Sequence, residues 1–299
     1  MLTINPAAIA TKDLHQFILG AVSPRPIAFV STMNNNGEPN LAPFSFFNAF
    51  SSNPPILVFS ANRRVEGNTT KDTLHNIEQN GECVINVVSY DIVRQMSLTS
   101  VEFPPEVNEF IKAGFTPILS EVVHPFRVKE SPVQLECKVQ QILPLGTGGG
   151  AGHLIICHVE RMHISEAVLD EKQQRIDPHK IDLVGRMGRF YYARASGDAV
   201  FEVVQPVLPV CIGFDQLPEV IRQSDIFTGN NLGLLASLIQ PPAEEEVRAF
   251  AAQDATVQQI LQQSSGVVVA LQRYAKHWLD DNNLLIGAKL AYLSSYIKK

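Results

Sequence analysis

The sequence predicts a mainly β protein with added helices, followed by a helical C-terminal region. From Ile27 to Ser60, short apolar runs are separated by turn residues, a pattern typical of antiparallel strands. After Val204, the segment Gln205-Pro206-Val207-Leu208-Pro209 interrupts the strand pattern, and most of the remaining chain has helical periodicity. We therefore expect one domain at residues 1–204, and a linker with a helical extension at residues 205–299.

The first hairpin is predicted by its turn, Asn34-Asn35-Asn36-Gly37. Asn and Gly tolerate the positive φ angles that tight hairpins require. We therefore expect a strand over 27–32 to pair with a strand over 40–47. Asn53-Pro54-Pro55 then marks the entry to a third strand over 56–60.

A short helix is expected over residues 70–80. Leu74 and Ile77 share one helical face, Thr70 precedes Lys71 at the start, and Gly81 comes next as a C-terminal stop. The other elements expected in this domain are strands over 82–88, 132–145 and 153–165, and short helices over 91–99 and 106–113.

The glycine-rich stretch Gly146–Gly152 lies between the two longest predicted strands. It lacks the Gly-Lys-Ser/Thr ending of a P-loop and leads into a strand, so we interpret it as a flexible hairpin tip. His153, His158 and His163 come after it on one strand. Five-residue steps alternate between the strand faces, and His153 and His163 would be about 33 Å apart at ~3.3 Å per residue. We expect no metal site.

Composition and charge exclude several classes of partner. The chain has 299 residues and a net charge of −6, which gives no basic field for nucleic acid or an anionic membrane. No signal-like N-terminus or membrane-length apolar run is present, so a soluble cytoplasmic protein is expected. The four cysteines are distant in sequence and form no Cys-x-x-Cys motif, so we expect buried, reduced thiols.

The stretch Gly266–Asp280 supports the helical extension. Its apolar residues share one broad face, whereas Gln272, Arg273, Lys276 and His277 fall outside that face. This face must be buried. It could pack on the strand domain of its own chain, or the extension could be a module for protein interaction or dimer stabilisation.

Two stretches carry candidate binding residues. Lys71-Asp72-Thr73 lies at a predicted helix start, where unpaired N–H groups and the lysine charge favour an anion such as a phosphate monoester. An ordinary capped surface helix is the alternative. Phe44-Ser45-Phe46-Phe47-Asn48 combines aromatic rings with a hydroxyl and an amide, which suits a heterocyclic ligand or, alternatively, a strand at a dimer interface.

In order and spacing, four motifs resemble the flavin reductase-like family of split-barrel FMN-binding proteins, over roughly Leu14–Phe201. They are Pro24-Arg25-Pro26-Ile27, Ala42–Asn48, Pro54–Ser60 and Lys71–Ile77. The resemblance implies an antiparallel Greek-key barrel, a homodimer with FMN near the subunit interface, and NAD(P)H-dependent flavin reduction with small-molecule nucleotides as substrates. Such a reductase could supply a monooxygenase, and FAD could replace FMN.

The resemblance also assigns residues by position. Ser45, Lys71 and Thr73, with Asp72 in the same motif, would hold the phosphate. The ribityl chain and ring would be lined by Phe46, Phe47, Asn48 and Ser60, with Arg25 at the ring edge. Gly185-Arg186-Met187-Gly188 resembles a late family segment near the pocket mouth, so Arg186 would receive a nicotinamide nucleotide phosphate.

No protein nucleophile or base is expected, because a flavin brings its own hydride chemistry. No Gly-x-Ser-x-Gly elbow or His-Glu-x-x-His motif occurs either. The helical extension departs from the family pattern, and it keeps open a second function, a non-enzymatic FMN-binding electron carrier or flavin sensor.

Overall fold

The computed structural model describes residues 1–203 and 211–297. The predicted domain boundary at 204/205 and the proline-containing segment 205–209 lie outside the described residues. The chain divides into two compact units, Met1–Phe201 and Glu202–Lys299. Each unit has a hydrophobic core of its own.

The first unit contains a seven-stranded sheet in the order β2-β1-β5-β8-β9-β4-β3. Every neighbouring pair is antiparallel, which confirms the predicted mainly β class. The strands are β1 Ala28–Met33, β2 Pro39–Phe44, β3 Phe47–Ser52, β4 Pro55–Ser60, β5 Glu82–Val87, β8 Val133–Pro144 and β9 His153–Ile164; the short pairs are β6 Pro117–Ile118 with β7 Arg127–Val128 and β10 Val184–Arg186 with β11 Tyr192–Arg194.

Four α-helices accompany the sheet among the described residues of this unit. They are α1 Thr11–Ala21, α2 Asp72–Asn80, α3 Val93–Leu98 and α4 Glu109–Ala113. Short 3-10 helices lie at Pro6–Ala8, Tyr90–Ile92, Glu166–Val168 and Gly197–Ala199, and in the second unit at Phe214–Gln216.

The first hairpin forms as predicted, with Ala28 opposite Phe44 and Met33 opposite Pro39. Its turn is held by the Asn34 side chain, whose Oδ1 accepts the N–H groups of Asn36 and Glu38 at 3.0 Å each. The expected strand over 40–47 is wrong at its end, because β2 stops at Phe44.

A bend at Ser45 and Phe46 separates β2 from β3 and gives neighbouring aromatic rings different environments. In one straight strand, Phe44 and Phe46 would share a face. Instead Phe44 is buried with its ring 5.1 Å from that of Phe59, whereas Phe46 is only half-buried. The bend therefore directs Phe46 away from the core.

Helix α2 begins one residue later than its expected cap would place it. Lys71 is the N-cap and makes no side-chain cap hydrogen bond, whereas the Thr70 hydroxyl contacts His75 Nε2 at 2.8 Å. Gly81 ends the helix at φ 67°, a conformation that glycine adopts without strain. Leu74 and Ile77 are buried against the sheet, as their spacing predicts.

Three of the four cysteines meet in the core. Cys83, Cys137 and Cys157 lie on the adjacent strands β5, β8 and β9, all with free thiols, and the Sγ atoms of Cys83 and Cys157 are 3.8 Å apart. Cys211 is exposed, so the expectation of four buried thiols is wrong for this residue.

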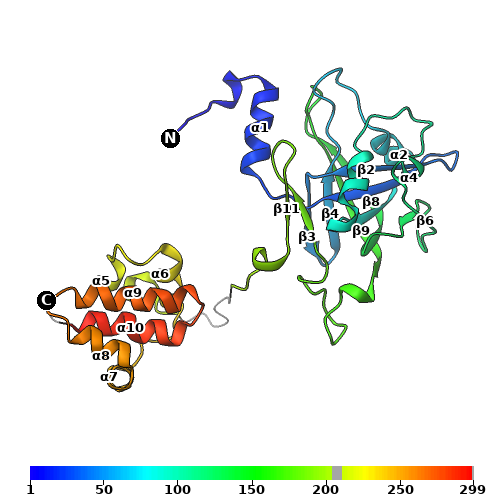
Figure 1. The fold of residues 1–299 in the computed structure, drawn as a ribbon. Coiled ribbons are helices and arrows are strands. Elements are labelled where there is room, and N and C mark those ends of the chain that lie inside the picture. Colours follow the sequence, from blue (N-terminus) through cyan, green and yellow to red (C-terminus); the bar gives the residue numbers. More distant parts are fainter. Residues whose placement is uncertain (204–210, 298–299) are drawn as a thin grey trace. The chain divides into compact units, whose positions relative to one another are not determined.

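The second unit is helical and contains its own core. Its α9 and α10 lie side by side (Figure 1), and the apolar face of α9 is buried within this unit through Leu271, Ala275 and Leu279. The face therefore packs on neighbouring helices of its own unit. The helices are α5 Glu219–Arg222, α6 Gly229–Ala236, α7 Glu244–Gln253, α8 Ala255–Leu261, α9 Val267–Asp280 and α10 Leu284–Tyr296.

Gln272 departs from the expected helical pattern. The periodicity places it outside the apolar face of α9, but it is buried. Its Nε2 donates to the Val220 carbonyl at 2.9 Å, and its Oε1 accepts the Ser224 hydroxyl at 2.7 Å. These two bonds satisfy the buried amide. Within residues 1–203 and 211–297, no helix combines the length and apolar character needed to cross a bilayer.

Candidate functional site

A cavity of ≈300 Å³ lies beside the bend between β2 and β3. It brings together six of the ten residues selected from the sequence: Arg25, Ser45, Phe46, Phe47, Asn48 and Ser60. Most of the remaining wall is apolar, and consists of Val22, Pro24, Pro26, Phe50, Val58, Phe59 and Leu154. Apolar walls with a few directed polar groups are typical of cofactor sites.

Arg25 links several backbone segments around this cavity through hydrogen bonds. The residue is only 5% exposed, and its guanidinium donates to the carbonyls of Leu19 (2.7 Å), Val22 and Met187 (3.2 Å). Its Nε also lies 3.5 Å from Ser45 Oγ. Burial, with the charge of Arg186, lowers the pKa of Arg25. Arg25 therefore orients the wall and the Ser45 hydroxyl rather than presenting a free charge.

Ser60 is held in the wall of the cavity by Asn62, a residue that the sequence reasoning missed. The Ser60 hydroxyl donates to Asn62 Oδ1 at 2.7 Å, and the Ser60 N–H donates to the Phe46 carbonyl at 2.8 Å. A Cβ on Gly152 would lie 2.6 Å from Ser60 Oγ, so a side chain at this position would displace the Ser60 hydroxyl. The two-residue spacing of Ser60 and Asn62 was the available sequence signal.

Lys71 lies at the N-terminus of α2 with its Nζ 4.8 Å from the centroid of the Phe44 ring. Across residues 1–203 and 211–297, no carboxylate forms an ion pair with it. Burial is the main cause that lowers the pKa of Lys71, followed by the charge of Arg64. A half-buried cation beside a helix start without a side-chain cap favours binding of an anion. The positive end of the helix dipole favours an anion at the same place.

Thr73 and Asp72 lie in the first turn of the same helix. The Thr73 hydroxyl donates to Asn40 Oδ1 at 2.8 Å, so its proton already has an acceptor. Asn40 Nδ2 in turn donates to Glu109 at 3.2 Å, and burial raises the pKa of this carboxyl. Thr73 is thus held in place by its hydrogen bond to Asn40. Asp72 is half-buried in the first turn, where a carboxylate stabilises the helix. No sequence pattern points to Asn40 or Glu109.

The glycine run connects β8 to β9, which confirms the predicted hairpin tip, and it is bonded to the loop before α2. Gly150 N–H donates to the Arg63 carbonyl at 3.1 Å, and Arg63 N–H donates to the Ala151 carbonyl at 2.8 Å. A Cβ on Gly149 would lie 2.6 Å from the Val65 carbonyl oxygen. The run therefore packs closely against the loop 61–70 that leads into α2.

Arg186 faces a second cavity of ≈410 Å³, which shares Ser45 with the first. Its guanidinium stacks 4.6 Å from the ring centroid of Tyr192, its partner across the β10–β11 pair. In the part of the chain that the structure describes, no acidic group pairs with Arg186. The walls are Ile27, Pro43, Ser45, Met96, Ser97, Ser100, Arg186, Phe190 and Tyr192.

His15 on α1 is a further neighbour of the first cavity that the sequence did not indicate. Its ring lies 6.2 Å from that of Phe46. Burial, with the charge of Arg25, lowers the pKa of His15. The sequence patterns do not predict helix α1, so none of them points to this residue.

The three histidines of β9 have separate partners. His153 Nδ1 contacts the Ala61 carbonyl at 3.1 Å, His158 contacts Glu160 at 2.9 Å, and His163 contacts the buried Glu136 at 2.7 Å. The described residues contain no group of three ligands that could hold a metal ion.

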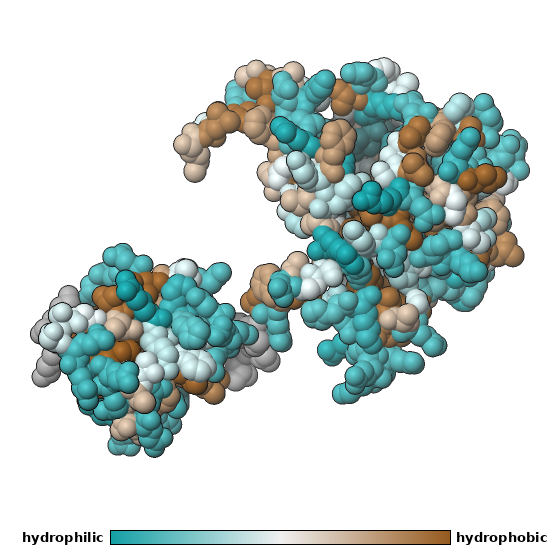
Figure 2. Space-filling view, viewed as in Figure 1, coloured by the Kyte–Doolittle hydropathy of each residue, from teal (hydrophilic) through white to brown (hydrophobic). Residues whose placement is uncertain are grey.

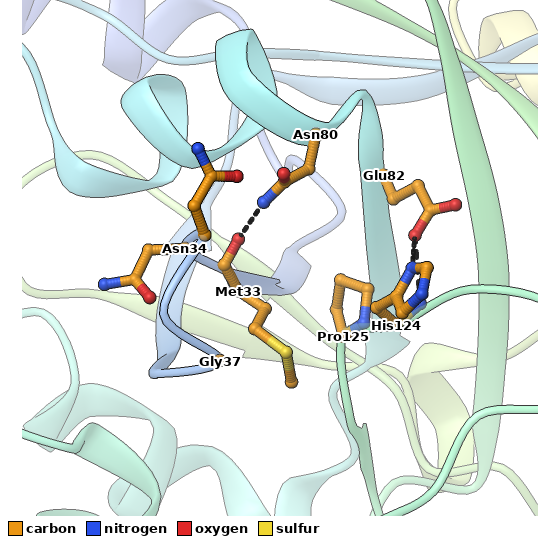
Figure 3. A pocket seen from close by; sticks show the side chains of 8 residues that line it. Met33, Asn34, Gly37, Asn80, Glu82, His124 and Pro125 are labelled. Atoms are coloured by element: carbon orange, nitrogen blue, oxygen red, sulfur yellow. Dashed lines mark hydrogen bonds and ion pairs between the residues drawn. The ribbon is translucent and has the colours of Figure 1, made fainter.

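A polar cavity of ≈340 Å³ beside the first hairpin is a weaker candidate (Figure 3). Its polar groups bond one another, because Asn80 Nδ2 donates to the Met33 carbonyl at 2.6 Å and His124 Nδ1 pairs with Glu82 at 2.7 Å. None of the ten residues selected from the sequence lines it. The first two cavities therefore form the candidate site.

Comparison with known proteins identifies the first unit. Residues 20–185 match the model of the flavin reductase like domain. An uncharacterized protein of Aquifex aeolicus is 40% identical over 190 residues, covering 64% of this chain and 94% of that protein. YwrF of Bacillus subtilis, also uncharacterized, is 33% identical over 200 residues, covering 66% of this chain and 96% of YwrF.

Several solved structures are similar to the first unit in fold and sequence. Nitrilotriacetate monooxygenase component B from Bacillus cereus is 33% identical, with a TM-score of 0.63 over 68% of this chain and 98% of that one. The 2-nitrobenzoate 2-nitroreductase NbaA of Pseudomonas fluorescens is 28% identical, with a TM-score of 0.61 over 70% and 98%. A flavin reductase with a split barrel domain from Shewanella frigidimarina, 24% identical with a TM-score of 0.57 over 67% and 95%, shares the fold. The chain therefore belongs to the flavin reductase-like family, and its first unit has the split-barrel fold.

Proposed function

We propose that the protein is an FMN-binding, NAD(P)H-dependent flavin oxidoreductase. The observation that carries this proposal is the half-buried Lys71 at the start of α2, which has no acidic partner among the described residues, together with a cavity walled by aromatic rings, hydroxyls and an amide. This donor set fits a phosphate monoester joined to a flat, largely apolar ring. A bound flavin would supply the hydride and electron chemistry.

Eight of the ten residues selected from the sequence have the following roles in this proposal. Lys71 and the first N–H groups of α2 bind the phosphate, with Thr73 anchoring the turn through Asn40. Phe46 and Phe47 cover the apolar part of the ring, and Asn48 and Ser60 offer polar contacts to the ribityl chain and the ring edge. The resemblance assigns Ser45 to the phosphate, but Ser45 lines the cavity with these residues, so in this proposal its hydroxyl contacts the ribityl chain. Arg25 positions Ser45 from behind.

The second cavity is the proposed entry for the nicotinamide nucleotide. It shares Ser45 with the flavin cavity, so a ligand bound there would lie next to the ring. Within residues 1–203 and 211–297 Arg186 has no acidic partner, so its charge is offered to a nucleotide phosphate. Hydride transfer requires the nicotinamide ring to stack closely on the flavin ring. This pocket therefore has to position the nicotinamide ring and need not supply a base.

We further propose a homodimer that supplies reduced flavin to a monooxygenase in the cytoplasm. The relative from Bacillus cereus is a component of a monooxygenase. No residue of α1 is buried, and Phe50 and Phe190 are 69% and 92% exposed, which favours a covering subunit. Apolar and polar residues are interspersed over the N-terminal segment in Figure 2. The free thiols of the core suit a reducing compartment.

The test is an absorbance spectrum of the protein after FMN is added and excess removed, followed by anaerobic NADH or NADPH. Flavin bands that bleach with either nucleotide support the reductase, and the faster one names the donor. Bands that bleach only with dithionite support the second function, an electron carrier or sensor. Repeating the loading with FAD tests whether it replaces FMN. No retained flavin and no turnover with free FMN would contradict both functions.

A further inference from the structure

A second cation lies near Lys71 and already holds a carboxylate. Arg64 Nη2 pairs with Glu102 Oε1 at 2.9 Å. The charges of Arg64 and Glu102 act on Lys71 in opposite directions, since Arg64 lowers the pKa of Lys71 and Glu102 raises it. Arg64 also donates to the carbonyl of Thr70, the residue before Lys71, at 3.0 Å, so two cations and the Glu102 carboxylate lie at the start of α2, where Asp72 is a second carboxylate.

Arg64 is fixed from behind by its own loop. Its Nη1 donates to Thr69 Oγ1 at 2.8 Å and to the Thr70 carbonyl at 3.0 Å, and its backbone N–H donates to the Thr69 carbonyl at 2.9 Å. The close packing of Gly149 on the Arg64 and Val65 carbonyls holds the loop in place. Only the Nη2 side of the guanidinium faces a partner from outside this loop.

Glu102 is held far less firmly. Its side chain is 65% exposed, against 28% for that of Arg64, and it comes from the connection between α3 and α4. Within the described residues, Arg64 is the sole side chain with which Glu102 forms an ion pair or hydrogen bond. An exposed pair of this kind is weak and easily exchanged for another anion.

We propose that Glu102 is a built-in competitor for the phosphate of the flavin: it occupies Arg64, the second cation of the phosphate site, and is released when a phosphate monoester binds. The inference rests on the proposed function, because it concerns the phosphate end of the same site. Glu102 thereby sets the affinity for phosphorylated flavin without touching the ring.

The charge balance supports this exchange. Lys71 and Arg64 provide two positive charges, which match the roughly −2 charge of a terminal phosphate monoester. Glu102 neutralises one of them while the site holds no phosphate. The site therefore favours FMN, with its terminal phosphate, over riboflavin, which has no phosphate. It also favours FMN over FAD, whose two linked phosphates carry one charge each.

The first test compares Glu102→Gln with Glu106→Gln in the full-length protein. Both glutamates are exposed and lie in the same connection, but only Glu102 pairs with Arg64. Removing the competitor should tighten FMN binding about two- to fivefold, the range of an exposed ion pair, and leave riboflavin binding unchanged. Glu106→Gln should change neither. Unchanged or weaker FMN binding in Glu102→Gln, or an equal gain in Glu106→Gln, would overturn the inference.

The second test uses Arg64→Gln alone and combined with Glu102→Gln. Arg64→Gln should weaken binding of FMN but not of riboflavin, and the gain from Glu102→Gln should disappear in the double variant. A gain that persists without Arg64 would overturn the inference. Failure of the proposed function looks different, because FMN would then bind neither the wild-type protein nor any variant.

Discussion

Replacement of Lys71 by alanine tests the phosphate site directly. The lysine is half-buried, its Nζ atom lies over the Phe44 ring, and it has no acidic partner among the described residues, so its charge is available to a ligand. A hydrogen bond to a charged group contributes about 1.5–3 kcal/mol. Loss of that bond should raise the Kd for FMN about 10- to 150-fold.

The measurement is a titration of FMN and riboflavin by quenching of flavin fluorescence. Lys71→Ala should weaken FMN binding and leave riboflavin nearly unaffected, because riboflavin lacks the phosphate. Lys138→Ala is a matched control, since this lysine is exposed on β8. An unchanged Kd for FMN, or an equal loss for riboflavin, would refute the assignment of Lys71 to the phosphate.

Three further predictions concern the surroundings of the site. Burial and Arg25 lower the pKa of His15, so the native state should lose stability as pH falls below about 6.5; His15→Gln should flatten that part of the curve in urea unfolding. Gly149→Ala should weaken FMN binding and lower stability by about 1–3 kcal/mol, because its Cβ meets the Val65 oxygen, whereas Gly148→Ala has open space. A chain ending at Val203 should stay folded and bind FMN, because the first unit has its own cores.

Each of these predictions has a contradicting result. An unchanged pH slope in His15→Gln would show that another group causes the acid sensitivity. Equal effects of the two alanine variants would show that close packing of the glycine run is unimportant. Aggregation of the chain ending at Val203 would show that the first unit depends on the helical unit. Calorimetry or circular dichroism would verify folding in every case.

Elements fixed by local chemistry were predictable. The Asn34–Gly37 turn specified the first hairpin, because side-chain acceptors and a positive φ at glycine act within four residues. The end of α2 was predictable from Gly81 in the same way. The motifs that carry the resemblance also lie in order along the chain, which is why six residues that line one cavity could be selected from the sequence.

Features that depend on distant partners were not predictable. The bend at Ser45 and Phe46 results from burial of Phe44 against Phe59 and from the Ser60 N–H bond to Phe46, which pattern alone does not contain. Gln272 looks polar and exposed until Val220 and Ser224 satisfy its amide. Arg64 and Glu102 are far apart in the sequence, and neither belongs to a motif.

The distribution of thiols makes it possible to follow local unfolding of the sheet by thiol modification. Cys211 is exposed, whereas Cys83, Cys137 and Cys157 are enclosed at the centre of the sheet core. A thiol-specific reagent should therefore modify one sulfur at once and the other three only as fast as the strands separate. The slow phase would measure the opening of the split barrel without any added label, and binding of a ligand to the barrel should lengthen it.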